Sequence, residues 1–70
     1  MNTTNYTTSP KNLGELLQEW RREIGFTRPS AAQALAVPLP TFNGWIAGKP
    51  CGKEKMVRLL MQSIIDEHRR

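Results

Sequence analysis

The side chains in this sequence that can do chemistry are mostly basic, and they are concentrated in the middle of the chain. Residues 26–58 hold the whole net charge of +4, because they contain five basic side chains and one acidic side chain, Glu54. Residues 1–25 and 59–70 are each neutral. The five are Arg28, Lys49, Lys53, Lys55 and Arg58. Cations gathered in this way bind polyanions, with nucleic acid the first candidate. A basic surface that is merely solvated is the alternative, and charge alone does not separate the two.

Residues for catalysis or metal binding are few. Cys51 is the only cysteine and lies between Pro50 and Gly52 with no base near it in sequence, and His68 is the only histidine. One cysteine cannot form an internal disulfide, and no cluster has the spacing of a zinc site. We therefore predict that the protein is not an enzyme and uses no cofactor, no metal and no small-molecule ligand.

Length and hydropathy limit the architecture. Seventy residues are enough for one small domain, which buries only about 60% of the surface of its unfolded chain. No apolar run approaches the ~20 residues that a membrane helix requires, and the N-terminal residues have no secretory leader. The sequence therefore predicts a protein of the cytoplasm with no membrane partner.

Periodic apolar residues predict four helices, over about 13–24, 28–35, 39–47 and 53–67. Asn12 and Glu15 have the spacing of a capping box, and Gly25 ends the first helix. Thr27 is the expected N-cap of the second helix, which Pro38 prevents from continuing. Residues 1–11 are mostly Asn, Thr and Ser and are predicted to form a flexible tail. The expected fold is all-α and compact, with four to five helices and one domain over residues 12–67.

Residues 27–49 follow a recognisable pattern. It consists of Thr27, the small residue Ala32, apolar Leu35 and Val37, then Thr41, Phe42 and Trp45, and finally Gly48 and Lys49. With this pattern the chain resembles the helix-turn-helix of Cro, lambda-type repressors and related xenobiotic-response-element regulators, and the likeness extends over about residues 12–65. The turn position that this family usually gives to glycine is Ala36 here. The resemblance implies a lambda repressor-like DNA-binding domain.

The resemblance also implies how double-stranded DNA would be bound. In this family the third helix lies in the major groove with its N-terminal residues against the base edges. The expected base contacts are Leu39, Pro40, Asn43 and Gly44. Asn43 has a donor and an acceptor for adenine N6 and N7, a pairing that contributes ~1 to 3 kcal/mol of discrimination. Leu39 and Pro40 would pack on thymine methyl groups, and Gly44 would allow a close approach.

Phosphate contacts are expected from a second set of side chains. Arg28 and Thr27 lie at the start of the second helix, whose N-terminus favours an anion. Lys49 follows the third helix, and two further lysines begin the last one. The full predicted set is Thr27, Arg28, Thr41, Lys49, Lys53 and Lys55.

The last predicted helix has more apolar residues than one core contact needs. Its seven apolar side chains cover an arc of roughly 240°, against the ~100° stripe of an ordinary surface helix. We expect Val57, Leu60 and Ile64 to face the core, and Leu59, Met61 and Ile65 to form a homodimer interface. A two-fold dimer would match a palindromic operator with half-sites one helical turn apart.

Two functions are compatible with these features. The first is a small Cro-like or autoregulatory regulator of transcription that binds a palindromic operator as a dimer, with repression and activation both open. The second is a helix-turn-helix descendant that binds and antagonises another regulator, suggested by the apolar residues where polar base readers are usual. The basic set favours the first, because a protein-binding descendant has little reason to keep it.

Overall fold

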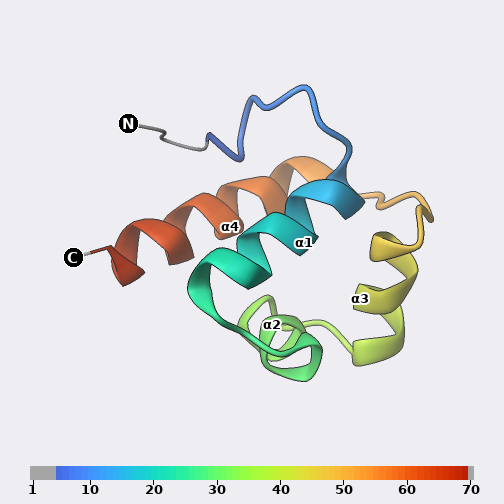
Figure 1. Cartoon of the computed structure of the whole chain (residues 1–70). Coiled ribbons are helices and arrows are strands. Elements are labelled where there is room, and N and C mark those ends of the chain that lie inside the picture. Colours follow the sequence, from blue (N-terminus) through green and yellow to red (C-terminus); the bar gives the residue numbers. More distant parts are fainter. Residues whose placement is uncertain (1–4, 70) are drawn as a thin grey trace.

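In the computed structural model the chain folds into four helices, and the structure describes residues 5–69 (Figure 1). The helices are α1 (Leu13–Ile24), α2 (Arg28–Ala34), α3 (Leu39–Ile46) and α4 (Glu54–His68), and the described residues contain no strand. Each end lies within one residue of the predicted range. The expectation of a compact all-α fold is therefore confirmed. In residues 5–69 no helix has the length and apolar character that a bilayer crossing requires.

Local capping explains where the first two helices begin. The Asn12 side chain accepts a hydrogen bond from the Glu15 backbone N–H at 2.9 Å, and Thr27 accepts one from the Ser30 N–H at 3.2 Å. Gly25 ends α1 in a left-handed conformation with a φ of 94°. These caps satisfy backbone donors and acceptors that have no partner inside a helix, so they fix the ends of the helices.

The turn between α2 and α3 contains a left-handed alanine. Ala36 has a φ of 61°, and among residues 5–69 it is the one non-glycine residue with a positive φ. The Ala36 N–H donates to Gln33 O and the Val37 N–H donates to Ala32 O, both at 3.0 Å. These bonds close α2 and direct the chain into α3, at a cost of about 1 kcal/mol for the strained alanine.

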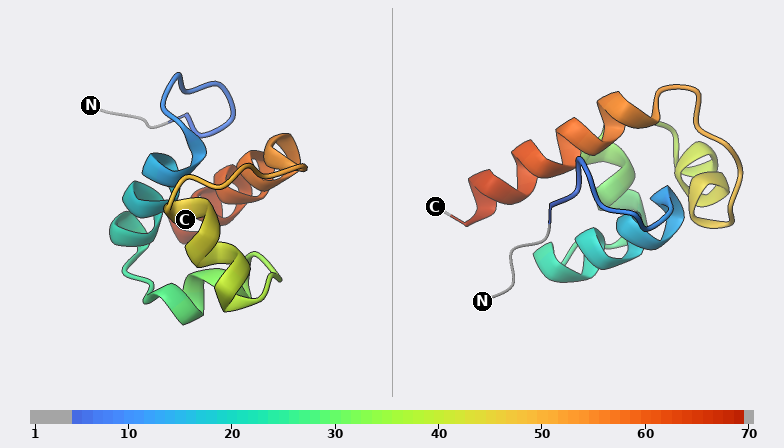
Figure 2. Two further views of the ribbon diagram at one scale, coloured as in Figure 1. Left: turned by 90° about the vertical axis from the view of Figure 1, so that its right-hand side faces the viewer. Right: turned by 90° about the horizontal axis from the view of Figure 1, so that it is seen from above.

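Helix α1 lies at the centre of the molecule. It contacts both α3 and α4, while α2 packs against α3, and two further views show α4 running beside α1 (Figure 2). Trp20 of α1 is fully buried, and its indole Nε1–H donates to the Met61 carbonyl of α4 at 3.1 Å. Phe42 and Trp45 of α3 complete the same core. The core therefore holds α3 in a fixed orientation on α1.

The face of α4 that enters the core differs from the predicted one. Val57, Met61 and Ile65 are buried, and Leu59 and Leu60 are exposed. The assignment of Met61 and Ile65 to a dimer interface is therefore wrong, and so is the placement of Leu60 in the core. Val57, Met61 and Ile65 are four residues apart and therefore share one face of α4. The Trp20 indole donates to the Met61 carbonyl, so this is the face that lies against α1.

The N-terminal segment is packed against the helices from residue 6 onward. Tyr6 is fully buried; its N–H donates to Gln62 Oε1 at 2.9 Å and its hydroxyl donates to Glu23 at 2.7 Å. Arg58 of α4 donates to the carbonyls of Ser9 and Lys11. The predicted flexible tail is thus contradicted for residues 5–11, because α1 and α4 together enclose the aromatic ring. Residues 1–4 lie outside the described part of the chain.

The end of α4 is held against the end of α1. The His68 ring packs edge-on against Phe26, with ring centroids 5.6 Å apart, and Arg69 forms an ion pair with Glu23. The hydrogen bond from Arg69, followed by that from the Tyr6 hydroxyl, lowers the pKa of Glu23. The same contact with Glu23 raises the pKa of Arg69. Glu23 therefore joins both ends of the described chain to α1.

Candidate nucleic-acid interface

A hydrogen bond joins the start of α2 to the middle of α3. The Arg28 Nη1–H donates to Asn43 Oδ1 at 3.3 Å. Arg28 is exposed and Asn43 is half-buried. The bond brings the predicted phosphate contact and the predicted base reader onto one surface. It also orients the Asn43 amide, with its oxygen toward the guanidinium.

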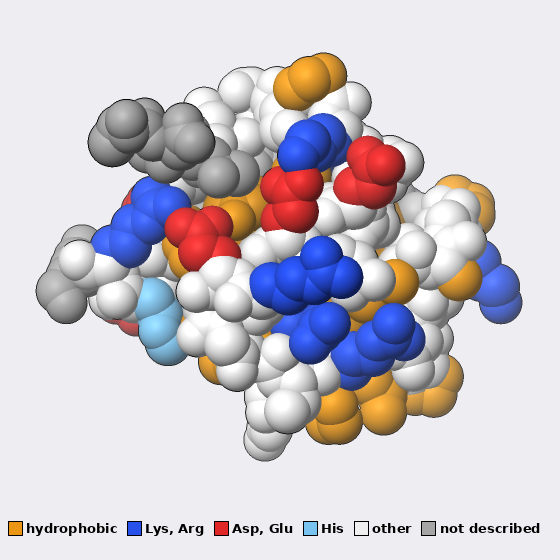
Figure 3. Space-filling model, in the orientation of Figure 1, with side chains coloured by type: hydrophobic (Ala, Val, Ile, Leu, Met, Phe, Trp, Pro, Cys, Tyr) orange, Lys and Arg blue, Asp and Glu red, His pale blue; other side chains and the backbone are white. Residues whose placement is uncertain are grey.

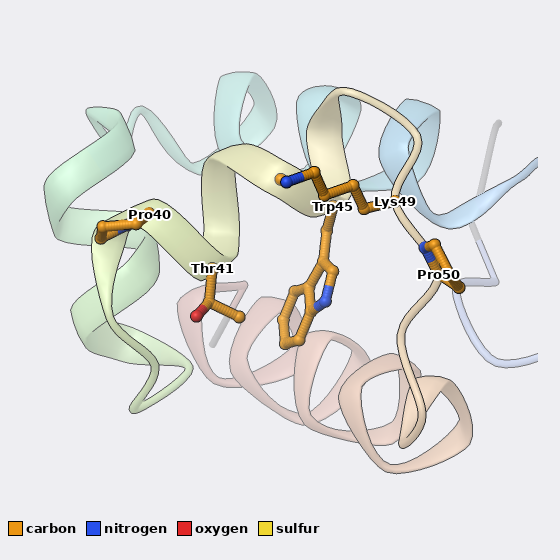
Figure 4. A pocket seen from close by; sticks show the side chains of 6 residues that line it. Pro40, Thr41, Trp45, Lys49 and Pro50 are labelled. Atoms are coloured by element: carbon orange, nitrogen blue, oxygen red, sulfur yellow. The ribbon is translucent and has the colours of Figure 1, made fainter.

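A hollow lies beside α3 on the side of the following loop (Figure 4). Its volume is about 340 Å³, and its lining consists of Pro40, Thr41, Gly44, Trp45, Lys49 and Pro50. The side chain of Lys49 lies over Gly44. A Cβ built on Gly44 would be 3.2 Å from Lys49 Cδ. The absence of a side chain at position 44 therefore allows the Lys49 chain to lie against α3, where its ammonium group borders the hollow.

Apolar side chains surround the beginning of α3. Leu39 is 36% exposed, and Pro38 and Pro40 are exposed on either side of it. Figure 3 shows hydrophobic side chains at the lower edge of the molecule, over the α2–α3 turn, with basic side chains above them. A surface of this composition can contact thymine methyl groups, or an apolar patch on a protein.

Thr27 has a structural role in addition to its predicted contact. Its Oγ1 accepts from the Ser30 N–H and donates to Ser30 Oγ at 3.0 Å. The hydroxyl is thus occupied in capping α2. Ser30, which was not among the predicted site residues, is exposed beside it. The sequence feature that could have indicated Ser30 is its position three residues after the N-cap Thr27, from which its hydroxyl reaches the same end of α2.

The basic residues of α4 are distributed differently from expectation. Lys53 and Lys55 are exposed at the start of α4 and line neither the hollow nor the contact between Arg28 and Asn43. Arg58, the fifth basic residue of the central region, is directed to the N-terminal segment and to Glu54, and its side chain is only 13% exposed. Arg58 is therefore structural.

The basic residues among the predicted phosphate contacts form no ion pair within the described part of the chain. Of the ion pairs formed within residues 5–69, which join Lys11 to Glu19, Arg58 to Glu54 and Arg69 to Glu23, none involves a predicted phosphate contact. Arg28, Lys49, Lys53 and Lys55 thus retain their charge for a partner. Among the described residues there is also no group of three or more His, Cys, Asp or Glu that could hold a metal ion.

Two residues of the hollow were absent from the predicted site. Trp45, which the sequence analysis names only as part of the 27–49 pattern, is buried and also forms one wall of the hollow. Pro50 follows Lys49 directly in sequence, and this adjacency was the available signal. Comparison of the chain with protein-family models, with curated proteins and with solved structures gives no match.

Proposed function

We propose that this protein is a sequence-specific DNA-binding regulator of transcription, acting in the cytoplasm, and that α2, the turn at Ala36 and α3 form its helix-turn-helix. The chief support for the proposal is the hydrogen bond between Arg28 and Asn43, because it brings together a guanidinium, which can contact a phosphate, and an amide, which can contact a base edge. Lys49, which borders the hollow beside α3 and forms no ion pair with another residue of 5–69, supports the same conclusion. The lambda repressor-like character of the fold is part of this proposal.

In the proposed complex, α3 enters the major groove with its N-terminal half against the bases. Asn43 pairs with an adenine, while Leu39 and Pro40 pack on thymine methyl groups. Arg28, which lies beside Asn43, and Lys49, which lies beside Gly44, contact the phosphates that border the groove. Thr41, on the wall of the hollow, adds a hydroxyl to the phosphate contacts.

The test begins with selection of binding sites from random double-stranded DNA, because the operator is unknown. Affinity for the selected site and for a shuffled duplex is then measured by fluorescence anisotropy. A protein that neutralises about 6 to 10 phosphates loses ~10³ to 10⁵ in affinity between about 50 and 200 mM salt. We expect a preference for the selected site together with a salt dependence of this kind.

Charge reversal tests the surface itself. Arg28→Glu and Lys49→Glu should weaken binding to all duplexes, because phosphate contacts carry no sequence information. Arg22→Glu is the matched control, since Arg22 is exposed on α1 and lines a different hollow with Lys11 and Glu15. An equal loss from all three variants would contradict the proposed interface.

A second candidate function is binding and antagonising another regulator. The observation in its favour is the exposed apolar group around Leu39, with Pro38 and Pro40 beside it. Folded protein that binds neither the selected nor the shuffled duplex at low salt would exclude the DNA proposal and favour this one.

A further inference from the structure

The outer face of α4 is apolar although it is exposed. Met56 is 65% exposed, Leu59 53% and Leu60 43%. The opposite face of the helix packs into the core through Val57 and Met61. The exposed stripe of Met56, Leu59 and Leu60 is therefore a surface that the described part of the chain does not cover. Contiguous apolar surface of this kind is typical of a site of association.

The charges around this stripe indicate what covers it. Lys53 and Lys55 are exposed at the start of α4, and Asp66 and Glu67 are exposed at its end. Arg58 pairs with Glu54 and Arg69 pairs with Glu23 of α1, so the charges that form no ion pair within residues 5–69 are basic at the start of α4 and acidic near its end, with the apolar stripe between them. Such a surface is complementary to an antiparallel copy of itself.

The helical register makes this complementarity specific. Leu60 and Glu67 are seven residues apart on one side of α4, and Lys53, the N-cap of the helix, lies seven residues before Leu60 at the start of the same side. A two-fold axis through Leu60 places Lys53 of each copy opposite Glu67 of the other, so the dimer contains two such pairs. A parallel arrangement would instead oppose Lys53 to Lys53. Antiparallel helices also bring opposite ends of their dipoles together.

We propose that the stripe of Met56, Leu59 and Leu60 binds a second copy of this chain, with the two α4 helices antiparallel and Leu60 on the two-fold axis. Leu59 belonged to the interface predicted from the sequence, and Met56 and Leu60 take the places of Met61 and Ile65. The use of this dimer to present two copies of α3 to a palindrome rests on the proposed DNA-binding function. The dimer itself does not depend on DNA.

Charge reversal tests the antiparallel register in the full-length protein without DNA. Only three apolar side chains per copy meet, so we expect dissociation on the order of micromolar, measured by sedimentation velocity from about 5 to 500 µM. Glu67→Lys should weaken the dimer by roughly tenfold, because both Lys53 contacts become repulsive. The double variant Lys53→Glu with Glu67→Lys should restore the wild-type constant. Glu15→Lys, the same charge change at an exposed position of α1, should leave it unchanged.

Disulfide trapping tests the position of the axis. Leu60→Cys, in a Cys51→Ser background, places a thiol beside its own copy and should give a disulfide-linked dimer on a non-reducing gel. Glu15→Cys in the same background should not. Circular dichroism shows whether each variant is folded.

Three results would overturn the dimer: a monomer at every concentration, a double reversal that fails to restore association, or equal trapping at positions 15 and 60. Specific DNA binding by a protein that stays monomeric would overturn the dimer and leave the proposed function standing. A dimer with the expected reversal pattern that binds no DNA would support the interface and overturn the proposed function.

Discussion

Gly14 of α1 lies directly against the main chain of Trp45 in α3. A Cβ built on Gly14 would be 2.8 Å from the Trp45 carbonyl oxygen and 3.0 Å from that of Ile46. Glycine is therefore what allows α1 and the end of α3 to approach this closely. Since α3 carries the proposed base contacts, this crossing sets where they are presented.

Substitution of Gly14 by alanine should destabilise the protein by about 1 to 3 kcal/mol, because the obstructing atoms are backbone and cannot rotate away. Urea unfolding followed by circular dichroism measures the change. Gly52→Ala is the matched control, since a Cβ there meets nothing within 4 Å. A Gly14→Ala midpoint equal to that of the control would refute the close approach.

Ala36→Gly should stabilise the protein. The alanine has a φ of 61°, and glycine removes the steric cost of that conformation, for a net gain of about 0.5 to 1 kcal/mol. Ala47→Gly provides the contrast, because Ala47 has a φ of −77° and should lose about 0.5 to 1 kcal/mol. Thermal melting distinguishes the two, and a lower melting temperature for both would be inconsistent with strain at Ala36.

The bond between Arg28 and Asn43 predicts that their contributions to DNA binding are coupled. Asn43→Ala should reduce the preference for the selected site by about 1 to 3 kcal/mol with little effect on random duplex. Arg28→Ala should weaken both, and part of its effect should disappear when Asn43 is already alanine. A double-mutant cycle should give a coupling of about 0.5 to 3 kcal/mol. Purely additive losses would show that the bond does not persist in the complex.

Glu23 predicts a loss of stability in acid. Hydrogen bonds from Arg69 and Tyr6 lower its pKa in the folded protein, so the unfolded chain takes up its proton at the higher pH. The stabilisation is therefore present near neutral pH and is lost as the pH falls below about 5 and through the folded pKa. Melting temperatures of wild type and Glu23→Gln should differ at neutral pH and converge in acid. A difference independent of pH would contradict this role.

The helices could be predicted from the sequence because their ends are encoded locally. Asn12, Thr27 and Gly25 act within three or four residues of themselves, and their bonds occur as their types suggest. The adjacency of Arg28 and Asn43 was not expected, because it depends on the angle between α2 and α3 and not on sequence spacing.

The rotation of α4 and the position of the N-terminal segment could not be obtained in the same way. An apolar arc of roughly 240° leaves several rotations compatible with burial, so periodicity alone could not choose between Met61 and Leu60. Tyr6 is a single aromatic residue in a polar segment and belongs to no periodic pattern. Its pocket is formed by α1 and α4, and a contact between Tyr6 and Gln62 spans 56 residues.

That contact also constrains when the fold can form during synthesis. Tyr6 is translated before all four helices, yet Arg58, Met61 and Gln62, which complete its surroundings and the core, belong to α4, the last of these helices to be made. While translation proceeds, α1 can form but cannot bury Trp20 and Tyr6 against α4. The nascent chain therefore cannot bury Trp20 and Tyr6, the two largest fully buried side chains of the described residues, until α4 has emerged.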